Sequence, residues 1–235
     1  MSATGPARAK KAATGSGKPA KKSRRSKGEQ TRRKILEAVL AVIAREGTRG
    51  VTHRSVAAEA GVQLSLTTYY FKDIESMIKE AFAQFSEHAR PDMDALWSGL
   101  FDYLDGYSAA ELRKRSVREE VCEQLAGHAT GYLMAQIVTK PVGLAVEQVF
   151  FTQARLSPEL RRMGIAHRQQ LLEPLVRLCR RFNPADPEID AELLLDTVTA
   201  LEYQALAMPP EQVDEELLRR LLRRHIGWLL GLKRA

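Results

Sequence analysis

The sequence predicts an all-α protein in which a small N-terminal domain of three helices is followed by a larger helical domain. Apolar residues recur at helical spacing through nearly the whole chain after residue 28, and no segment shows a convincing strand pattern. Two short helical segments lie close together on either side of Gly61. That arrangement is typical of a helix-turn-helix.

The first 27 residues differ in composition from the rest of the chain. The 235 residues carry a net charge of +7, and residues 1–27 contain nine Lys or Arg and no acidic residue. The remaining residues carry 27 basic and 29 acidic side chains. Because Met1 is its one large apolar residue, segment 1–27 cannot bury a core, and we expect a disordered basic tail. It is either a flexible arm that adds phosphate contacts to DNA or a solubilising leader.

Several classes of protein are excluded by composition and motifs. The longest apolar runs are a few residues, far short of the roughly 18 of a membrane span, and segment 1–27 lacks the apolar run that a signal peptide contains. Cys122 and Cys179 stand far apart, which fits buried thiols in a reducing cytoplasm and gives no disulfide framework. No metal-binding, phosphate-loop or nucleophile-elbow motif occurs, so we expect no enzyme, metal or cofactor.

The three N-terminal helices follow from apolar spacing and capping residues. The second is expected to begin at the N-cap Thr52 and to end at Gly61, and the third to cover residues 64–71 despite the strand propensity of its TTYY run. Residues 52–71 therefore form a helix-turn-helix, whose second helix enters the major groove of DNA. The first helix, over residues 29–47, ends at the cap Gly47 and carries an apolar stripe of Ile35, Leu36, Val39, Leu40 and Ile43.

Further helices account for the rest of the chain. We expect Asp73 to cap a fourth helix over residues 74–89, which Pro91 ends. An interruption near Gly127 or Gly131 is expected in the long helix 109–138. The remaining helices are expected over residues 93–104, 142–155, 158–182, 190–208 and 211–232.

Several spaced features coincide within residues 29–85, and they are Ile35, Leu36, Ala38, Gly47, Gly50, Thr52, Ala57, Ala60, Gly61, Val62, Tyr69 and Phe71. Through these features the region resembles the N-terminal domain of the TetR family of transcription regulators. The family often has a leucine at the core position that Thr67 occupies, a serine cap at Gln63 and a lysine at Ile74. Beyond this region the resemblance is one of architecture, and it implies a DNA-binding domain at 28–88 and a ligand-binding and dimerisation domain at 89–235.

The resemblance implies that the third helix and the start of the second contact DNA. Base edges would be contacted by Leu64, Ser65 and Thr68. The alternatives are that Leu64 and Thr67 pack inward and that His53 is merely exposed. Phosphate contacts would come from Tyr69, Tyr70 and Lys72 and, at a helix N-terminus, from Thr52, His53 and Arg54. The whole predicted DNA-binding set is Thr52, His53, Arg54, Gln63, Leu64, Ser65, Thr67, Thr68, Tyr69, Tyr70 and Lys72.

The larger domain is expected to bind a small effector and to form a dimer. The last two helices carry apolar stripes that fit a four-helix seam between two copies, unless they only close the monomer core. We expect His88 and His167 to be surface residues. The predicted effector site, for which ordinary core packing is the alternative, consists of Trp97, Phe101, His128, Tyr132, Glu147 and Phe151.

These observations favour a homodimeric, ligand-responsive transcription regulator that binds double-stranded DNA at a palindromic operator. That it is a repressor follows from the resemblance alone. The effector would be small and partly apolar, and it would act by shifting the fourth helix, which links the two domains. The alternative function is a basic-tailed architectural protein that coats DNA without strong sequence preference.

Overall fold

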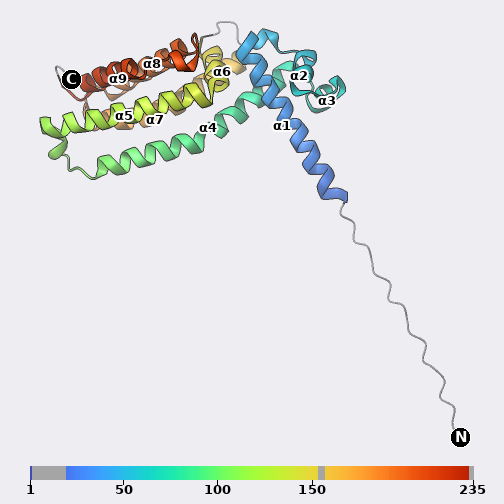
Figure 1. Cartoon of the computed structure of the whole chain (residues 1–235), viewed down its shortest axis with the longest axis horizontal. Helices are drawn as coiled ribbons and strands as arrows, with labels where there is room; N and C mark the ends of the chain where they lie inside the picture. The colour runs from blue at the N-terminus through green and yellow to red at the C-terminus, as the bar shows by residue number, and fades with distance from the viewer. Residues whose placement is uncertain (2–19, 153–156, 233–235) are drawn as a thin grey trace.

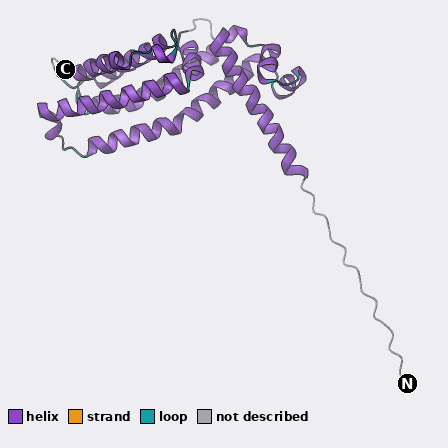
Figure 2. Ribbon diagram, viewed as in Figure 1, coloured by secondary structure: helices purple, strands orange, loops and turns teal. Residues whose placement is uncertain are grey.

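The computed structural model describes residues 1, 20–152 and 157–232 of the chain. Within these residues it contains α-helices, three short 3-10 helices and no strand, so the all-α prediction is confirmed (Figure 2). The first three helices gather at one end, and α9 ends at the far end of the bundle (Figure 1). The α-helices are α1 (Ala20–Glu46), α2 (His53–Ala60), α3 (Leu64–Tyr70), α4 (Ile74–Asp105), α5 (Arg115–Thr139), α6 (Pro141–Thr152), α7 (Pro158–Arg180), α8 (Pro187–Ala205) and α9 (Glu215–Leu229).

Helix α1 is longer than the sequence predicted. It begins at Ala20, so the expectation of disorder up to Lys27 is wrong for residues 20–27, and residues 2–19 lie outside the described residues. Ala, Lys and Arg are good helix formers, and extending an existing helix requires no new nucleus. As a result, the N-terminal part of α1 projects away from the rest of the protein (Figure 1).

The N-terminal core forms where α1 packs against α2 and α4. Ile35, Val39 and Ile43 of α1 are fully buried, as the predicted stripe requires, and they pack in one cluster with Val56 of α2 and Phe71. Burial of an aliphatic or aromatic side chain contributes about 1.5–3 kcal/mol. This packing stabilises α2, which at eight residues is too short to be stable alone.

Helix α4 runs through Pro91, so the prediction that Pro91 ends a helix is wrong. A proline inside a helix removes one backbone hydrogen bond and costs about 3 kcal/mol. Pro91 is exposed, and packing on both sides of it offsets the cost. Met77 and Phe82 of α4 lie in the N-terminal core, and Phe101 lies in the core of the larger domain. A single helix therefore joins the two cores, and it crosses the predicted domain boundary at residues 88 and 89.

Helix α6 also belongs to both cores. Leu144 packs in the core of the larger domain, whereas Val146 and Phe150 pack in the N-terminal core. The Phe150 ring stacks on Phe82 of α4 with 3.6 Å between ring centroids. The predicted end of this helix at residue 155 lies outside the described residues. Helices α4 and α6 therefore each contribute residues to both cores.

The larger domain is a bundle of α4 to α9, in which α5 packs against α9 and α7 against α8 (Figure 1). Helix α5 is continuous, so the expected interruption near Gly127 or Gly131 is wrong. Both glycines are exposed, and the helix is held by buried residues on its other face, including Leu125 and Leu133. None of the described helices is long and apolar enough to cross a membrane.

Candidate nucleic-acid interface and ligand cavity

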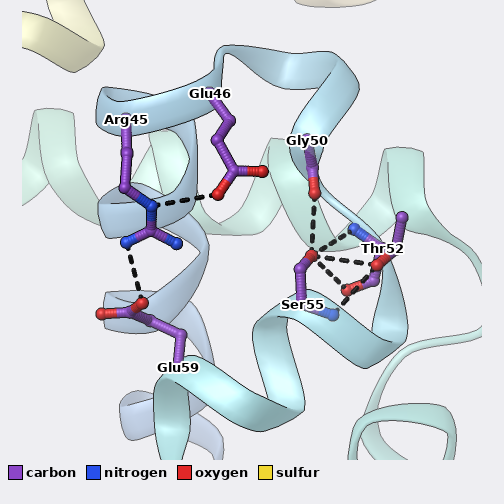
Figure 3. A network of polar contacts seen from close by, with 6 residues as sticks. All are labelled: Arg45, Glu46, Gly50, Thr52, Ser55 and Glu59. Carbon is purple, nitrogen blue, oxygen red and sulfur yellow. Dashed lines mark hydrogen bonds and ion pairs between the residues drawn. The ribbon is translucent and has the colours of Figure 1, made fainter.

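The start of α2 is fixed by a reciprocal capping arrangement (Figure 3). The Ser55 backbone N–H donates to Oγ1 of Thr52, and the Thr52 backbone N–H donates to Oγ of Ser55, each at 2.9 Å. Oγ of Ser55 also lies 2.8 Å from the carbonyl oxygen of Gly50. A Cβ at Gly50 would lie 2.4 Å from Cβ of Glu46, so only glycine fits this close approach of the turn to α1.

The turn between α2 and α3 requires a left-handed residue. Gly61 has φ 61° and ψ 38°, a conformation that glycine adopts without steric cost. Its neighbour Val62 donates a backbone hydrogen bond to the carbonyl of Ala57 at 3.0 Å, which closes the turn. The side chain of Gln63 makes no capping hydrogen bond at the start of α3. The predicted helix, tight turn and helix over residues 52–71 are therefore all present.

Thr67 does not belong to the predicted DNA-binding surface. Its side chain is fully buried, and its hydroxyl donates to the carbonyl of Leu64 at 2.8 Å. Nδ1 of His53, the first residue of α2, lies 3.1 Å from the same hydroxyl. A buried hydroxyl needs such partners. Thr67 and His53 thus hold α3 against α2, and the inward alternative for Thr67 is correct.

The opposite side of α3 is exposed. Leu64 is 47% exposed and Tyr69 is 78% exposed, and Ser65 and Thr68 are exposed between them. The hydroxyl of Thr68 donates to the carbonyl of Ser65 at 3.1 Å, and its oxygen can still accept a hydrogen bond. The inward alternative for Leu64 is wrong. The helix presents a short surface of one aliphatic, two hydroxyl and one phenol side chain.

The predicted phosphate contacts surround this surface. Arg54 and Lys72 are exposed, and Tyr70 is half-buried with its ring edge-on to Tyr69, 5.1 Å between centroids. The Tyr70 hydroxyl lies beside α1, since a Cβ at Gly28 would be 3.3 Å from it. The guanidinium of Arg45 bonds both Glu46 and Glu59 at 3.0 Å (Figure 3). This pairing offsets one of the two negative charges, and no ion pair is found for Arg54 or Lys72 among the described residues, so both can approach phosphates.

A cavity of about 300 Å³ lies inside the bundle of the larger domain. Four predicted effector-site residues, Trp97, His128, Tyr132 and Glu147, line it. Phe101 and Phe151 do not, so the prediction is wrong for both. Phe101 is buried under the guanidinium of Arg177, which lies 3.8 Å from its ring centroid, and Phe151 packs against the N-terminal core. Aromatic identity alone could not separate these two core residues from lining residues.

A chain of polar contacts crosses the domain beside the cavity. Nε2 of His167 on α7 lies 3.0 Å from Oε2 of Glu147 on α6, and Nδ1 lies 3.1 Å from the hydroxyl of Ser86 on α4. The Tyr203 hydroxyl on α8 donates to the other Glu147 oxygen at 3.3 Å. His167 is buried, so its prediction as a surface residue is wrong. The chain connects four helices, including α4.

Glu202 of α8 is a cavity residue that sequence reasoning missed. Its side chain is 4% exposed, and burial, followed by the nearby Glu147 carboxylate, raises the pKa of Glu202 to about 8. Burial disfavours the charged form of a carboxyl group. The sequence does contain a signal for a buried acid. Glu202 is the lone acid in the otherwise uncharged segment TVTALEYQALA, three residues before the buried Ala205.

The outward face of α8 and α9 is apolar. Leu193 on α8 and Leu217, Leu221 and Trp228 on α9 are 42–61% exposed, although Leu194, Leu222 and Ile226 on the same helices are buried. Leu217, Leu221 and Trp228 recur at helical spacing along one side of α9. Part of the apolar surface of α8 and α9 therefore remains outside the core of the single chain. An exposed apolar patch of this kind marks an interaction surface.

Comparisons with known proteins find similarity to transcriptional regulators. Residues 117–227 match the family model of the tetracyclin repressor-like C-terminal domain. The chain is 28% identical over 174 residues to the HTH-type transcriptional regulator BetI of Rhizobium meliloti strain 1021, which covers 74% of this chain and 75% of that protein.

Solved structures resemble this chain in fold. A transcriptional regulator from Rhodococcus sp. RHA1 superposes with a TM-score of 0.61 at 21% identity, covering 85% of this chain and 96% of that one. A TetR-like transcriptional regulator, also from Rhodococcus sp. RHA1, gives a TM-score of 0.57 at 14% identity, with 86% and 97% covered. At these identities the match shows a shared all-helical fold.

Proposed function

Since this chain belongs to the TetR family of helix-turn-helix transcriptional regulators, we propose that it is a repressor that binds a palindromic operator as a homodimer and responds to a small, partly apolar effector. The family consists of DNA-binding, ligand-responsive regulators that dimerise and are not enzymes. The alternative of an architectural DNA-coating protein has no support from the comparisons.

The observation that carries the proposal is the exposed side of α3. Leu64, Ser65 and Thr68 stand outward on a helix whose buried side is anchored by Thr67. The Leu64 side chain and the Thr68 methyl group suit contact with a thymine methyl, and the hydroxyls of Ser65 and Thr68 suit hydrogen bonds to base edges. Arg54, Tyr69 and Lys72 flank this surface and would contact the phosphates that fix its register.

A homodimer supplies the second recognition helix. The outward apolar face of α8 and α9, with Leu193, Leu221 and Trp228, provides a self-complementary surface of the kind that two-fold dimers use. Two α3 helices related by a two-fold axis would read the two halves of a palindrome, one or more helical turns of about 34–36 Å apart.

The effector would act through α4. Three residues, of which the last is the cap Asp73, separate the end of α3 from the start of this helix at Ile74, and Ser86 of the helix contacts His167 beside the cavity. A ligand that favours one position of α4 would change the separation of the two α3 helices and so the population of DNA-competent dimers.

Selection from a library of random duplexes at about 150 mM salt, followed by sequencing of the bound fraction, tests this function. A sequence reader should prefer its operator over random DNA by roughly a thousandfold or more. An enriched palindrome is the expected result, and enrichment of no sequence would contradict the proposal.

A further inference from the structure

The carboxyl group of Glu202 faces the ligand cavity without a partner. Its side chain is 4% exposed, and it lines the cavity. Among the residues that the structure describes, none forms a hydrogen bond or an ion pair with it. Buried polar side chains are nearly always hydrogen-bonded, so an unpartnered one beside a cavity points to a ligand that supplies the missing group.

The lysine, the other carboxylates and the histidines around the cavity are already paired. Nζ of Lys140 lies 2.7 Å from Oδ2 of Asp92, and Glu147 is bonded by both His167 and Tyr203. Two histidines on the cavity wall, His88 of α4 and His128 of α5, each donate through Nδ1 to a backbone carbonyl of their own helix at 2.7 Å. Helix α9 contributes only the apolar side chains of Ile226 and Leu229 to the wall. Glu202 is therefore the one described carboxyl group of the cavity wall that has no hydrogen-bond or ion-pair partner.

The wall around Glu202 suits an apolar cation. Phe85, Trp97 and Tyr132 contribute aromatic surface to the cavity, and most of the remaining wall is aliphatic. Aromatic faces attract cations, more strongly when water is excluded. Burial, followed by the nearby Glu202 and Glu147 carboxylates, raises the pKa of the Tyr132 phenol, so this ring stays neutral.

Resting on the proposed function, in which this cavity holds the effector, we infer that the effector is a small organic amine whose ammonium group binds the carboxylate of Glu202. Its apolar body lies against the aromatic and aliphatic wall. A volume of about 300 Å³ is at the low end of small-molecule sites, which run from roughly 300 to 1,000 Å³, so the amine is small.

Binding of the amine is coupled to release of a proton. With a pKa of about 8, Glu202 is mostly a neutral acid at pH 7 in the empty cavity. The ammonium ion binds the carboxylate form, so the Glu202 proton passes to the buffer and the amine keeps its own. Amine affinity therefore rises with pH from about 6 to about 8.

The test uses the full-length protein, without DNA, and a panel of small alkyl- and phenylalkylamines with the alcohol and the carboxylic acid of each. Isothermal titration at pH 7 in two buffers of different ionisation enthalpy reports both affinity and proton release. We expect at least one amine to bind about tenfold or more tightly than its alcohol, with nearly one proton released. The Glu202→Gln variant should bind the amine and its alcohol about equally. The control is Glu173→Gln, which replaces an exposed acid on α7 and should still bind the amine more tightly than the alcohol.

The proposal is overturned if no amine of the panel binds, if an alcohol or acid binds as tightly as its amine, or if the preference survives Glu202→Gln. Proton release by the wild-type protein is measured independently of any variant, so misfolding of Glu202→Gln cannot hide the answer. Because DNA is absent, failure here leaves the proposed operator binding intact, and that function fails separately if duplex selection enriches no sequence.

Discussion

Nδ1 of His53 lies 3.1 Å from the hydroxyl oxygen of Thr67, and this contact joins the first residue of α2 to the middle of α3. Since the Thr67 hydroxyl donates its hydrogen to the carbonyl of Leu64, it can accept a hydrogen bond from the histidine ring. The angle between the two helices of the helix-turn-helix thus depends on a buried polar contact as well as on apolar packing.

Replacing Thr67 with valine should destabilise the protein by about 1–2 kcal/mol. The substitution keeps the volume but removes the hydroxyl, so the His53 ring loses a partner inside a closely packed turn. Chemical unfolding at a fixed protein concentration measures the effect. Thr68→Val is the control, since Thr68 is exposed and should change stability by less than about 0.5 kcal/mol. Equal effects of the two substitutions would show that the His53–Thr67 contact contributes nothing.

Most of the fold could be predicted from the sequence because local signals agree with the packing. Helical spacing located the helices, and Thr52 and Gly61 marked the ends of α2, because capping depends on residues nearby in the chain. The continuation of α4 through Pro91 depends on two distant cores, and no local pattern contains that information.

The candidate site was less predictable for the same reason. The exposed side of α3 follows from helical spacing within seven residues, although Thr67 was assigned to the wrong side. His167 and Glu202 become cavity residues because α4, α6, α7 and α8 meet there. Their sequence neighbours gave no indication of Glu147, the hydrogen-bond partner of His167 and a close like charge to Glu202, which lies 20 residues before His167 and 55 before Glu202.

Replacing Glu202 with glutamine should stabilise the protein at alkaline pH. The unfolded chain loses the Glu202 proton near pH 4.5, whereas the folded protein loses it near pH 8. Between these values the folded state binds more protons, so its stability falls as pH rises. Glutamine does not titrate, so the variant does not lose stability in this way. Its free energy of unfolding at pH 9 should exceed that of the wild type by a few kcal/mol, since each pKa unit corresponds to about 1.4 kcal/mol.

Thermal or chemical unfolding of wild type and Glu202→Gln from pH 4 to pH 9 measures this difference. The two proteins should have similar stability near pH 4, and their curves should separate between about pH 5 and pH 8. A constant difference across this range would mean that Glu202 titrates at its ordinary pKa in the folded protein.

Lys72→Ala and Tyr70→Phe should weaken DNA binding about equally for all sequences, because both side chains are proposed to contact phosphates. Loss of each Lys72 should also reduce the magnitude of the slope of log affinity against log salt by about one unit. A dimer loses two such lysines, so its slope should fall by about two units. Tyr70→Phe removes a neutral donor and should leave the slope unchanged. Lys114→Ala, an exposed lysine on the far side of the larger domain, is the control. A change in base preference in either variant would argue for base contact instead.

Replacing Leu193 with glutamate should convert the dimer to a monomer. Leu193 is 54% exposed on the outward face of α8, and a charge there would be buried without a partner in the proposed interface. Val138→Glu is the matched control, since Val138 is 56% exposed and lies on α5 rather than on α8 or α9. Sedimentation should give about the 26.3 kDa chain mass for Leu193→Glu and twice that for the control. A dimeric Leu193→Glu protein would exclude this face of α8 as the interface.

The most direct test of sequence reading by α3 is duplex selection with wild type and Thr68→Ala side by side. We expect the wild type to enrich a palindrome, and the variant to enrich one with the same spacing but altered or relaxed bases at one symmetric pair of positions. A lost base contact of this kind costs about 1–3 kcal/mol of discrimination. Identical base preferences for Thr68→Ala, and likewise for Ser65→Ala, would contradict the account, because the outward side of α3 would then not be the surface that reads the operator.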